Sequence, residues 1–408
     1  MVSGPLRTVF VKVHLYIGLT FGLLFVLMGL TGTVLTWREE IDAALNPDLL
    51  VASAPARVPV GGPSIDAVTR KLLADPRYGR PSSLMLPRDE HGVFVAVYPL
   101  KGPEAGPGRS RQVMVDPITL DIKGERLWGV PGLSRQQLVP TIFHLHRYLL
   151  AGDTGKTITG ICGMVILITV LMGLVLWLPR MNRRAWLQSV RISHGGSWPR
   201  FNFSLHRAGG LFIAPVLLMS AFSGWYLNLP KWVTPIIGSV MTLSAPARPQ
   251  SAPAEAGTHT LSPALAVAAA QREYPDALVT RVGLPRKPGD VYEIRLRQPG
   301  EIREDAGATR LWLDAHTGQR LGARDPMQAT SGDAFINWLF PLHTGEAFGI
   351  PGRVFITLYG FAPLMFALTG ILIWWKRRSG HRRHMARERE RERARLKVAR
   401  RARGAHGA

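Results

Sequence analysis

Residues 203–229 read FSLHRAGGLFIAPVLLMSAFSGWYLNL, an apolar stretch in which one histidine and one arginine are the only ionisable groups apart from a tyrosine. About 20 consecutive apolar residues form a helix long enough to cross a hydrocarbon core of about 30 Å. Three further runs of this kind occur in the 408-residue chain, at residues 9–37, 157–178 and 353–375. The sequence therefore predicts an α-helical membrane protein with four transmembrane helices.

The first run, residues 9–37, lies where a secretory signal peptide would lie. Its apolar stretch is longer than a signal-peptide core, and no small-residue cleavage site closely follows Trp37. We therefore expect this run to be an uncleaved transmembrane helix.

The positive charge of the chain is unevenly distributed. Its 50 Lys and Arg and 28 Asp and Glu give a formal net charge of +22. Residues 38–140 and 230–334 each carry only +1, whereas residues 141–229 carry +7 and residues 335–408 carry +11. Positive residues flank transmembrane helices on the cytoplasmic side. This predicts a bacterial inner-membrane protein with both termini and the loop at 179–200 in the cytoplasm, and the two near-neutral segments in the periplasm.

The basic tail at residues 377–408 resembles an arm that binds nucleic acid. Its alternating arginine and glutamate residues are also typical of a solvated helix, and its excess of positive charge suits contact with anionic lipid. We favour the lipid interpretation and expect no nucleic-acid partner.

Histidines and glycines recur at fixed spacings along the chain. An offset of 192 relates the first span to the third: His14, Gly18 and Thr31-Gly32 recur as His206, Gly210 and Ser223-Gly224. An offset of 197 relates the second span to the fourth: His146, Gly155, Gly163, Gly173 and Trp177 recur as His343, Gly352, Gly360, Gly370 and Trp374. The predicted unit is a helix, a periplasmic domain and a second helix, used twice in the same direction as a tandem parallel repeat.

The two periplasmic segments share one pattern. Leu86-Pro87-Arg88 and Asp116 recur as Leu284-Pro285-Arg286 and Asp314, at an offset of 198. In each segment a stretch with helical periodicity, 65–73 or 264–272, precedes short alternating runs bounded by turn residues. Each segment is therefore predicted to be an α+β domain, with a helix packed on a small antiparallel sheet.

The predicted order along the chain follows from these boundaries. It is transmembrane helix 1 at 9–37, periplasmic domain 1 at 38–140, an interfacial segment with transmembrane helix 2 at 141–178, a cytoplasmic loop at 179–200, transmembrane helix 3 at 201–229, periplasmic domain 2 at 230–334, an interfacial segment with transmembrane helix 4 at 335–376, and the basic tail at 377–408.

Four of the twelve histidines lie at the matched positions, and ionisable groups in or beside membrane spans mark functional sites. The topology brings His14 and His206 to the cytoplasmic side and His146 and His343 to the periplasmic side. Two neutral imidazoles on facing helices can ligate one haem iron from opposite sides. We therefore predict two haems, with the axial pairs His14/His206 and His146/His343. The alternative is that these histidines are hydrogen-bonded interfacial groups in a structural bundle.

The haems are predicted to be b-type. Cys162 is the single cysteine, so the chain has no Cys-x-x-Cys-His motif and no disulfide. His144 competes with His146 as a ligand, but its matched position is Pro341, which favours His146. Arg147 and Arg207 directly follow two of the proposed ligands and could bind haem propionates.

Other catalytic classes lack their signatures in this sequence. We find no Ser/His/Asp set, no paired buried carboxylates and no His-Glu-x-x-His motif. These absences disfavour hydrolytic functions.

The chain resembles the PepSY-associated transmembrane proteins, also called iron-regulated membrane proteins, and among them the bacterial inner-membrane siderophore reductases. The resemblance covers roughly residues 8–378 and rests on these motifs: His14 with Gly18 and Gly32, Leu145-His146-Arg147, Trp177 with Pro179, Leu205-His206-Arg207 with Gly210, and Pro341-Leu342-His343-Thr344-Gly345-Glu346 with Pro351-Gly352-Arg353. It implies PepSY-like periplasmic domains, two haem b groups, and reduction of ferric siderophore iron to Fe(II) in the periplasm. The electron donor would be a separate cytoplasmic reductase or a quinol.

This function is chemically consistent, because hard oxygen ligands of a siderophore hold ferric iron much more tightly than ferrous iron. Three other functions remain open from the sequence. One is a dihaem reductase of another periplasmic acceptor, such as a quinone, a copper ion or a protein. Another is a haem-free PepSY membrane protein that regulates a peptidase. The third is a transporter, which would need broken mid-membrane helices and buried acidic residues that the sequence does not indicate.

Overall fold

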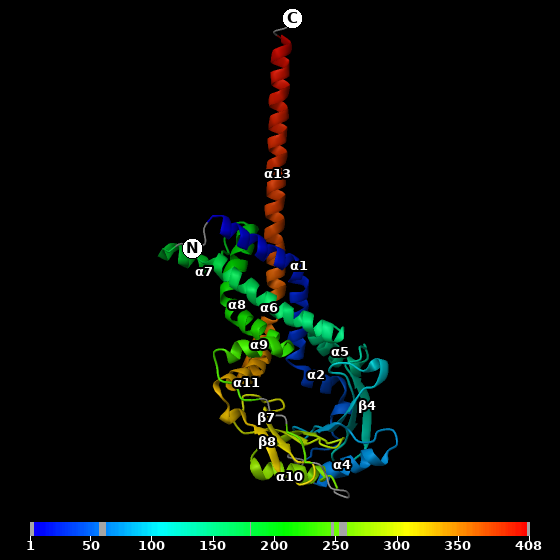
Figure 1. The fold of residues 1–408 in the computed structure, drawn as a ribbon. Coiled ribbons are helices and arrows are strands. Elements are labelled where there is room, and N and C mark those ends of the chain that lie inside the picture. Colours follow the sequence, from blue (N-terminus) through cyan, green and yellow to red (C-terminus); the bar gives the residue numbers. More distant parts are fainter. Residues whose placement is uncertain (1–3, 57–62, 180, 246–248, 253–258, 406–408) are drawn as a thin grey trace. The chain divides into compact units, whose positions relative to one another are not determined.

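The computed structural model describes residues 4–56, 63–179, 181–245, 249–252 and 259–405. Within these residues, four helices are long and apolar enough to cross a membrane: α1 (Pro5–Leu35), α6 (Gly152–Trp177), α8 (Trp198–Asn228) and a C-terminal stretch, Glu346–Arg393 (Figure 1). The C-terminal stretch contains α12 (Gly349–Tyr359) and most of α13 (Ala362–Ala405). These helices match the four predicted spans, so the chain has the features of an α-helical membrane protein.

The remaining elements are short. The other helices are α2 (Arg38–Leu45), α3 (Pro47–Leu50), α4 (Pro63–Ala74), α5 (Arg135–Tyr148), α7 (Arg183–Val190), α9 (Pro230–Gly238), α10 (Pro263–Glu273) and α11 (Ser331–Thr344), with 3-10 turns η1 (Gly102–Glu104), η2 (Pro326–Gln328) and η3 (Glu346–Phe348). The strands are β1 (Ser83–Met85), β2 (Phe94–Pro99), β3 (Ser110–Val115), β4 (Ile122–Trp128), β5 (Leu278–Gly283), β6 (Tyr292–Arg297), β7 (Thr309–Leu313) and β8 (Arg320–Arg324).

The chain divides into two compact units. The first, here called the helix unit, comprises residues 1–29, 165–218 and 361–408. The second, the sheet unit, comprises residues 30–164 and 219–360. Each unit is described by itself below.

The sheet unit contains one antiparallel sheet of eight strands in the order β4-β3-β2-β1-β5-β6-β7-β8. Its two halves come from the two segments treated as separate domains in the sequence, and they join where β1 pairs with β5. Without this pairing both strands would be exposed edges with unpaired backbone groups. The two segments therefore form a single sheet, which the pattern of either segment alone does not reveal.

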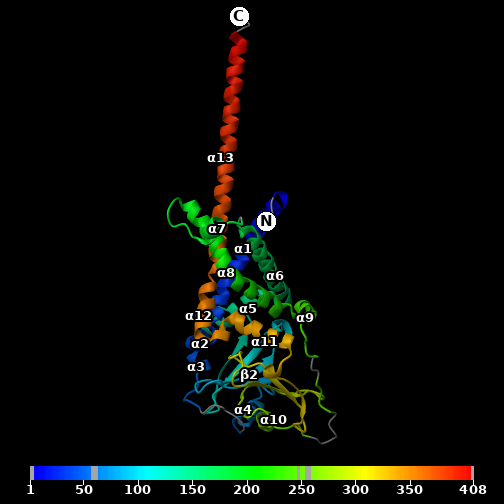
Figure 2. The ribbon, with the colours of Figure 1, turned by 90° about the vertical axis from the view of Figure 1, so that its left-hand side faces the viewer.

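One face of the sheet is covered by α4 and α10, which lie side by side along it in both views (Figures 1 and 2). The core between these helices and the sheet is shared by the two segments. It contains fully buried side chains from α4 and its strands (Ile65, Val68, Leu72, Leu84 and Phe94) and from α10 and its strands (Val267, Ile294, Leu296 and Leu311). On the opposite face lie α5 and α11, the helices that carry His146 and His343.

Asp116 and Asp314, the matched aspartates, close equivalent turns after β3 and β7. In both, Oδ1 accepts hydrogen bonds from the amides two and three residues further on, at 2.8–3.1 Å. Oδ2 accepts a third from the preceding segment, from Ser53 at 2.7 Å or Ala252 at 3.1 Å. Burial alone would raise the pKa of these carboxyls, but the amide donors outweigh it and lower the pKa of Asp314 to about 2. Asp116 and Asp314, which are 198 residues apart, thus accept equivalent hydrogen bonds in equivalent turns.

The link between α5 and α6 is tightly constrained. Leu149 and Leu150 have φ values of 47° and 57°, in the left-handed region that costs an L-residue about 1–2 kcal/mol. A Cβ on Gly155 would collide with the carbonyl oxygen of Tyr148, and one on Gly352 with the carbonyl oxygen of Gly345. These two glycines are the repeat-matched pair, so each allows a membrane helix to start directly against the histidine-bearing helix before it.

We expect Gly155→Ala and Gly352→Ala to lower the thermal unfolding temperature of the purified protein in detergent. The added methyl group meets backbone rather than a movable side chain, and overpacking of this kind costs about 1–3 kcal/mol. Gly380→Ala is the control, because no atom lies within 4 Å of a Cβ at that position. If the two variants unfolded at the same temperature as the control, the conclusion that a Cβ at these positions collides with the backbone would be wrong.

Candidate functional site

The helix unit brings together His14 of α1 and His206 of α8. Their ring centroids are 6.4 Å apart and the ring planes are nearly perpendicular, at 89°. Nδ1 of His14 lies 3.1 Å from the carbonyl oxygen of Thr169, and Nδ1 of His206 lies 2.8 Å from Oγ1 of Thr369. The Thr369 hydroxyl already donates to the carbonyl of Met365, at 2.7 Å. Both Nδ1 atoms are therefore donors, so each neutral ring carries its lone pair on Nε2, the form needed for metal ligation.

The sheet unit brings together His146, near the end of α5, and His343, near the end of α11. These ring centroids are also 6.4 Å apart, with the planes at 63°. Nδ1 of His146 lies 2.8 Å from Oγ1 of Thr31, and Nδ1 of His343 lies 2.8 Å from Oγ of Ser223. The Ser223 hydroxyl donates to its own helix, to the carbonyl of residue 219, so Nδ1 of His343 is the donor here too. The four histidines thus lie in the two spatial pairs His14/His206 and His146/His343, and their role as haem ligands stays a prediction.

Each of the four rings packs edge-on against a glycine of a neighbouring helix. A Cβ on that glycine would lie 3.4–3.6 Å from Cε1 of the ring. The glycine and histidine pairs are Gly173 with His14, Gly370 with His206, Gly32 with His146, and Gly224 with His343. These glycines are repeat-matched positions, and a longer side chain there would displace the ring from its partner.

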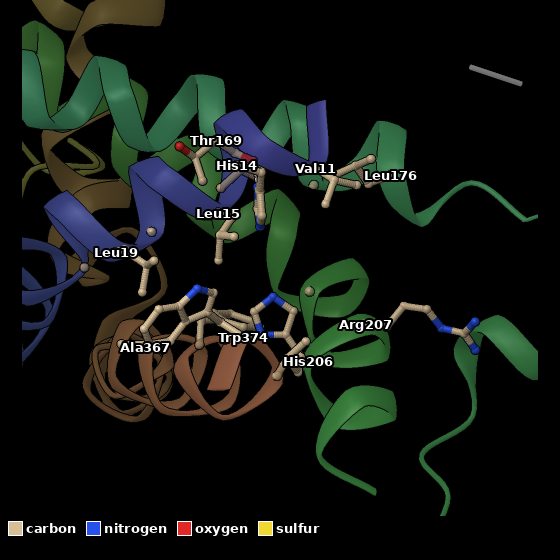
Figure 3. A pocket seen from close by; sticks show the side chains of 18 of the residues that line it. Val11, His14, Leu15, Leu19, Thr169, Leu176, His206, Arg207, Ala367 and Trp374 are labelled. Atoms are coloured by element: carbon tan, nitrogen blue, oxygen red, sulfur yellow. Dashed lines mark hydrogen bonds between the residues drawn. The ribbon is translucent and has the colours of Figure 1, made fainter. Parts of the chain in front are cut away.

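A cavity of about 590 Å³ lies between the helices of the helix unit and includes His14 and His206 in its wall. This volume is within the usual range for small-molecule and cofactor sites, about 300–1,000 Å³. Its lining is mainly apolar and aromatic, with Leu15, Leu19 and Trp374 among its residues, and the rings of His14 and His206 point into the same space (Figure 3). Such a cavity suits a large flat apolar ligand.

Arginine side chains also line this cavity: Arg7, Arg207, Arg377 and Arg378. They provide positive charge for the acidic groups of a ligand. Arg207 itself donates to the carbonyl oxygen of Gln188, and its side chain extends away from His206 (Figure 3). In the sheet unit Arg147 donates to the carbonyl oxygen of Leu227 at 3.3 Å. Arg147 and Arg207, which were predicted to bind haem propionates, therefore already donate hydrogen bonds to backbone carbonyls.

The donor set fits a haem better than a bare metal ion. Two imidazoles that bind one metal from opposite sides, with bonds of about 2 Å, have ring centres about 6 Å apart. No group of three or more His, Cys, Asp or Glu that could hold a metal ion occurs in the part of the chain that the structure describes. Two imidazoles would be sufficient only where a macrocycle supplied the other ligands, so the residues of each pair would fit a haem by their spacing, and at His14/His206 the adjoining cavity would accommodate its ring.

His144, the competing residue, has a different environment. It is buried at 3% exposure, its ring stacks on Tyr148 at 5.0 Å, and its Nδ1 bonds the carbonyl oxygen of Pro140 at 3.1 Å. The ring that lies opposite His343 is that of His146. The structure therefore supports the preference for His146 that the repeat suggested.

The hydroxyl partners Thr31, Ser223 and Thr369 were not recognised as site residues in the sequence. A signal was present for two of them, because Thr31-Gly32 recurs as Ser223-Gly224 and places a small hydroxyl before each ring-contacting glycine. Thr369 has no such counterpart, since the bond of His14 goes to a backbone carbonyl.

Comparison with known proteins gives one result. A search of curated proteins found no match to this chain. The family described as the PepSY-associated TM region matches residues 11–377, which include all four histidines of the two pairs. The match covers most of the chain, and the protein therefore belongs to the PepSY-associated TM region family.

Proposed function

We propose that this protein is a dihaem b-type reductase of the bacterial inner membrane that passes electrons from the cytoplasmic side to a ferric siderophore in the periplasm, which releases the iron as Fe(II). The observation that carries the proposal is the geometry of the two histidine pairs. Each pair holds its rings 6.4 Å apart, with every Nδ1 hydrogen-bonded to a neighbouring helix.

Haem, when bound, supplies a one-electron carrier whose potential depends on its axial ligands and on burial. The chain itself orients the ligands. The Nδ1 hydrogen bonds set the tautomer and the ring plane, and they make each imidazole a stronger electron donor. The mainly apolar lining of the cavity around His14 and His206 would lower the local dielectric at that site.

The repeat and the charge distribution support the direction of transfer. A tandem repeat of helix, soluble segment and helix would provide one histidine pair at each membrane face from a single ancestral arrangement. The basic segments flanking His14 and His206 support a cytoplasmic location for that pair. Electrons would enter there from a separate donor, a quinol or a soluble reductase, and would leave from the pair His146/His343.

The acceptor step is balanced by one electron per iron. The ferric ion in the chelate gains one electron and becomes ferrous, and the siderophore oxygens then hold it weakly. Since no proton or ligand must be added for this step, the protein need only provide a redox centre and a surface at which the chelate can rest.

We expect two b-type haems per chain in a pyridine haemochrome assay of the purified protein. His14→Ala and His206→Ala should each leave one haem, and the double variant should also leave one, because both residues serve the same site. His146→Ala and His343→Ala should behave in the same way at the other site. His144→Ala is the matched control and should keep both haems; a haem-free wild-type protein would refute the proposal.

Loss of an Nδ1 partner should change the haem potential without removing the haem. In Thr369→Val the Nδ1 of His206 loses its hydrogen-bond acceptor, and the ring would donate less electron density to the haem iron. Fe(III) is then less stabilised, so the midpoint potential should rise by roughly tens of millivolts. Ser223→Ala should do the same at the other site. Thr20→Val is the control, since its hydroxyl bonds the carbonyls of its own helix, at 2.8 Å for Tyr16. Unchanged potentials in both variants would contradict the role given to these hydroxyls.

The acceptor is tested with protein in detergent whose haems have been chemically reduced. Anaerobic addition of ferric siderophores should oxidise the haems rapidly and form a ferrous complex with an added ferrous chelator. A sample with both His146 and His343 replaced by Ala should react slowly. If quinones oxidised the haems rapidly and no ferric siderophore did, the acceptor would not be a siderophore.

A further inference from the structure

Four arginines form a continuous row across the second half of the sheet. The strand registers place Arg281 of β5 opposite Arg295 of β6, Arg295 opposite Arg310 of β7, and Arg310 opposite Arg324 of β8. Like charges directly opposite each other destabilise a sheet. A row of four therefore carries a cost that calls for a functional reason.

The row lies on the face that α4 and α10 do not cover. In β6, Tyr292, Ile294 and Leu296 are buried in the core, so the alternating Arg295 lies on the other face. This face is the one turned towards α11, because Arg303, which follows β6, lies 4.1 Å above the ring of Phe340. The same helix carries His343, so the row lies on the face of the sheet that is turned towards the proposed electron exit.

The first half of the sheet continues the same row with uncharged residues. The registers run from Arg281 to Met85, then to Val95, Met114 and Gly124. Met114 and Val95 pack against Leu49 and Leu50 of α3, and a Cβ on Gly124 would lie 3.0 Å from Leu49. The chain covers the apolar half of this row itself, whereas the four arginines remain partly or fully exposed.

Counter-charges near the row are few. In the described ranges, the acid within 4.0 Å of a row arginine is Glu293, at 3.8 Å from Arg310. Two further acids act on the row by their charge: Asp305 acts on Arg295 but pairs directly with Arg303 at 2.7 Å and Arg38 at 3.6 Å, and Asp333 interacts with Arg324.

Burial, followed by the charges of neighbouring arginines, lowers the pKa of Arg295 to about 10. Arg281 and Arg295 otherwise donate to neutral oxygens, those of Ser83 and Gly307. The row is thus a crowded set of cations that an anion would stabilise.

We propose that this arginine row binds the anionic groups of the ferric chelate, so that the substrate class is a negatively charged ferric siderophore with catecholate or carboxylate ligands. The proposal rests on the proposed function. Neighbouring strands are about 4.8 Å apart, so four arginines extend over about 14 Å, a length suited to a chelate with several charges. Guanidinium groups present paired donors that match carboxylate and catecholate oxygens.

The test uses gallium(III) chelates, which bind as the ferric chelates do but accept no electron, so docking is measured separately from reduction. Binding of a trianionic gallium tris-catecholate to the full-length protein in detergent is measured by calorimetry. Arg295→Gln and Arg310→Gln should each weaken it about tenfold, the loss expected for a hydrogen bond between charged groups. Arg295→Lys and Arg310→Lys retain the charge but lose the paired donors, and their affinities should fall between those of the wild type and the Gln variants.

Arg111→Gln is the matched control. It removes one positive charge from β3, outside the row, where Arg111 pairs with Glu125 at 2.5 Å. A cationic gallium tris-hydroxamate should bind weakly and should be insensitive to the row variants.

Equal weakening by Arg111→Gln would reduce the effect to net charge and overturn the proposal, as would displacement of the chelate by equimolar inorganic phosphate at fixed ionic strength. If the gallium chelate binds as expected while no ferric siderophore oxidises the haems, the docking site stands and the reductase function fails.

Discussion

The structure depends on holding two imidazole rings at a fixed distance, with their centroids 6.4 Å apart in each histidine pair. A histidine in or beside a membrane helix is costly unless its ring is hydrogen-bonded, and here each Nδ1 has such a bond. At His14, His206 and His343 the bond makes Nδ1 the donor and leaves the lone pair of the ring on Nε2. A glycine on the neighbouring helix lies beside Cε1 of each ring and leaves no room there for a side chain longer than a methyl group. A hydroxyl, a glycine and a histidine therefore form one arrangement that occurs at His206, His146 and His343, and at His14 a backbone carbonyl takes the place of the hydroxyl.

The positions of His146 and His343 in the sheet unit depend on residues outside the two rings. His146 and His343 lie at the ends of α5 and α11, and the chain must reverse immediately to start the next membrane helix. Gly155 and Gly352 make this possible because a Cβ at either position would collide with a carbonyl oxygen, that of Tyr148 or that of Gly345. Leu149 and Leu150 accept left-handed backbone angles at the first of these reversals. Such local strain is retained where the surrounding structure compensates for it, which is common at functional sites.

The shared sheet gives the histidine pair of the sheet unit a single rigid support. If the two soluble segments folded separately, α5 and α11 would be attached to two independent bodies. Pairing of β1 with β5 and one common core connect them instead, so the 6.4 Å spacing of His146 and His343 is maintained by the sheet as well as by the helices. The same pairing aligns the uncharged and arginine-rich halves of one face into a continuous row.

The sequence by itself determined the membrane class, the four spans and the residues that pair as His14/His206 and His146/His343. It could do so because spans have a length set by the bilayer, and because the offsets of 192 and 197 identify equivalent positions without any knowledge of packing. Only the tertiary structure decided three other features: the hydrogen-bond partner of each Nδ1, the joining of the two segments through β1 and β5, and the alignment of Arg281, Arg295, Arg310 and Arg324. These depend on which strands and helices become neighbours and in which register. A strand pattern specifies which face is buried, but the partner of an edge strand is chosen by the packing of the whole unit.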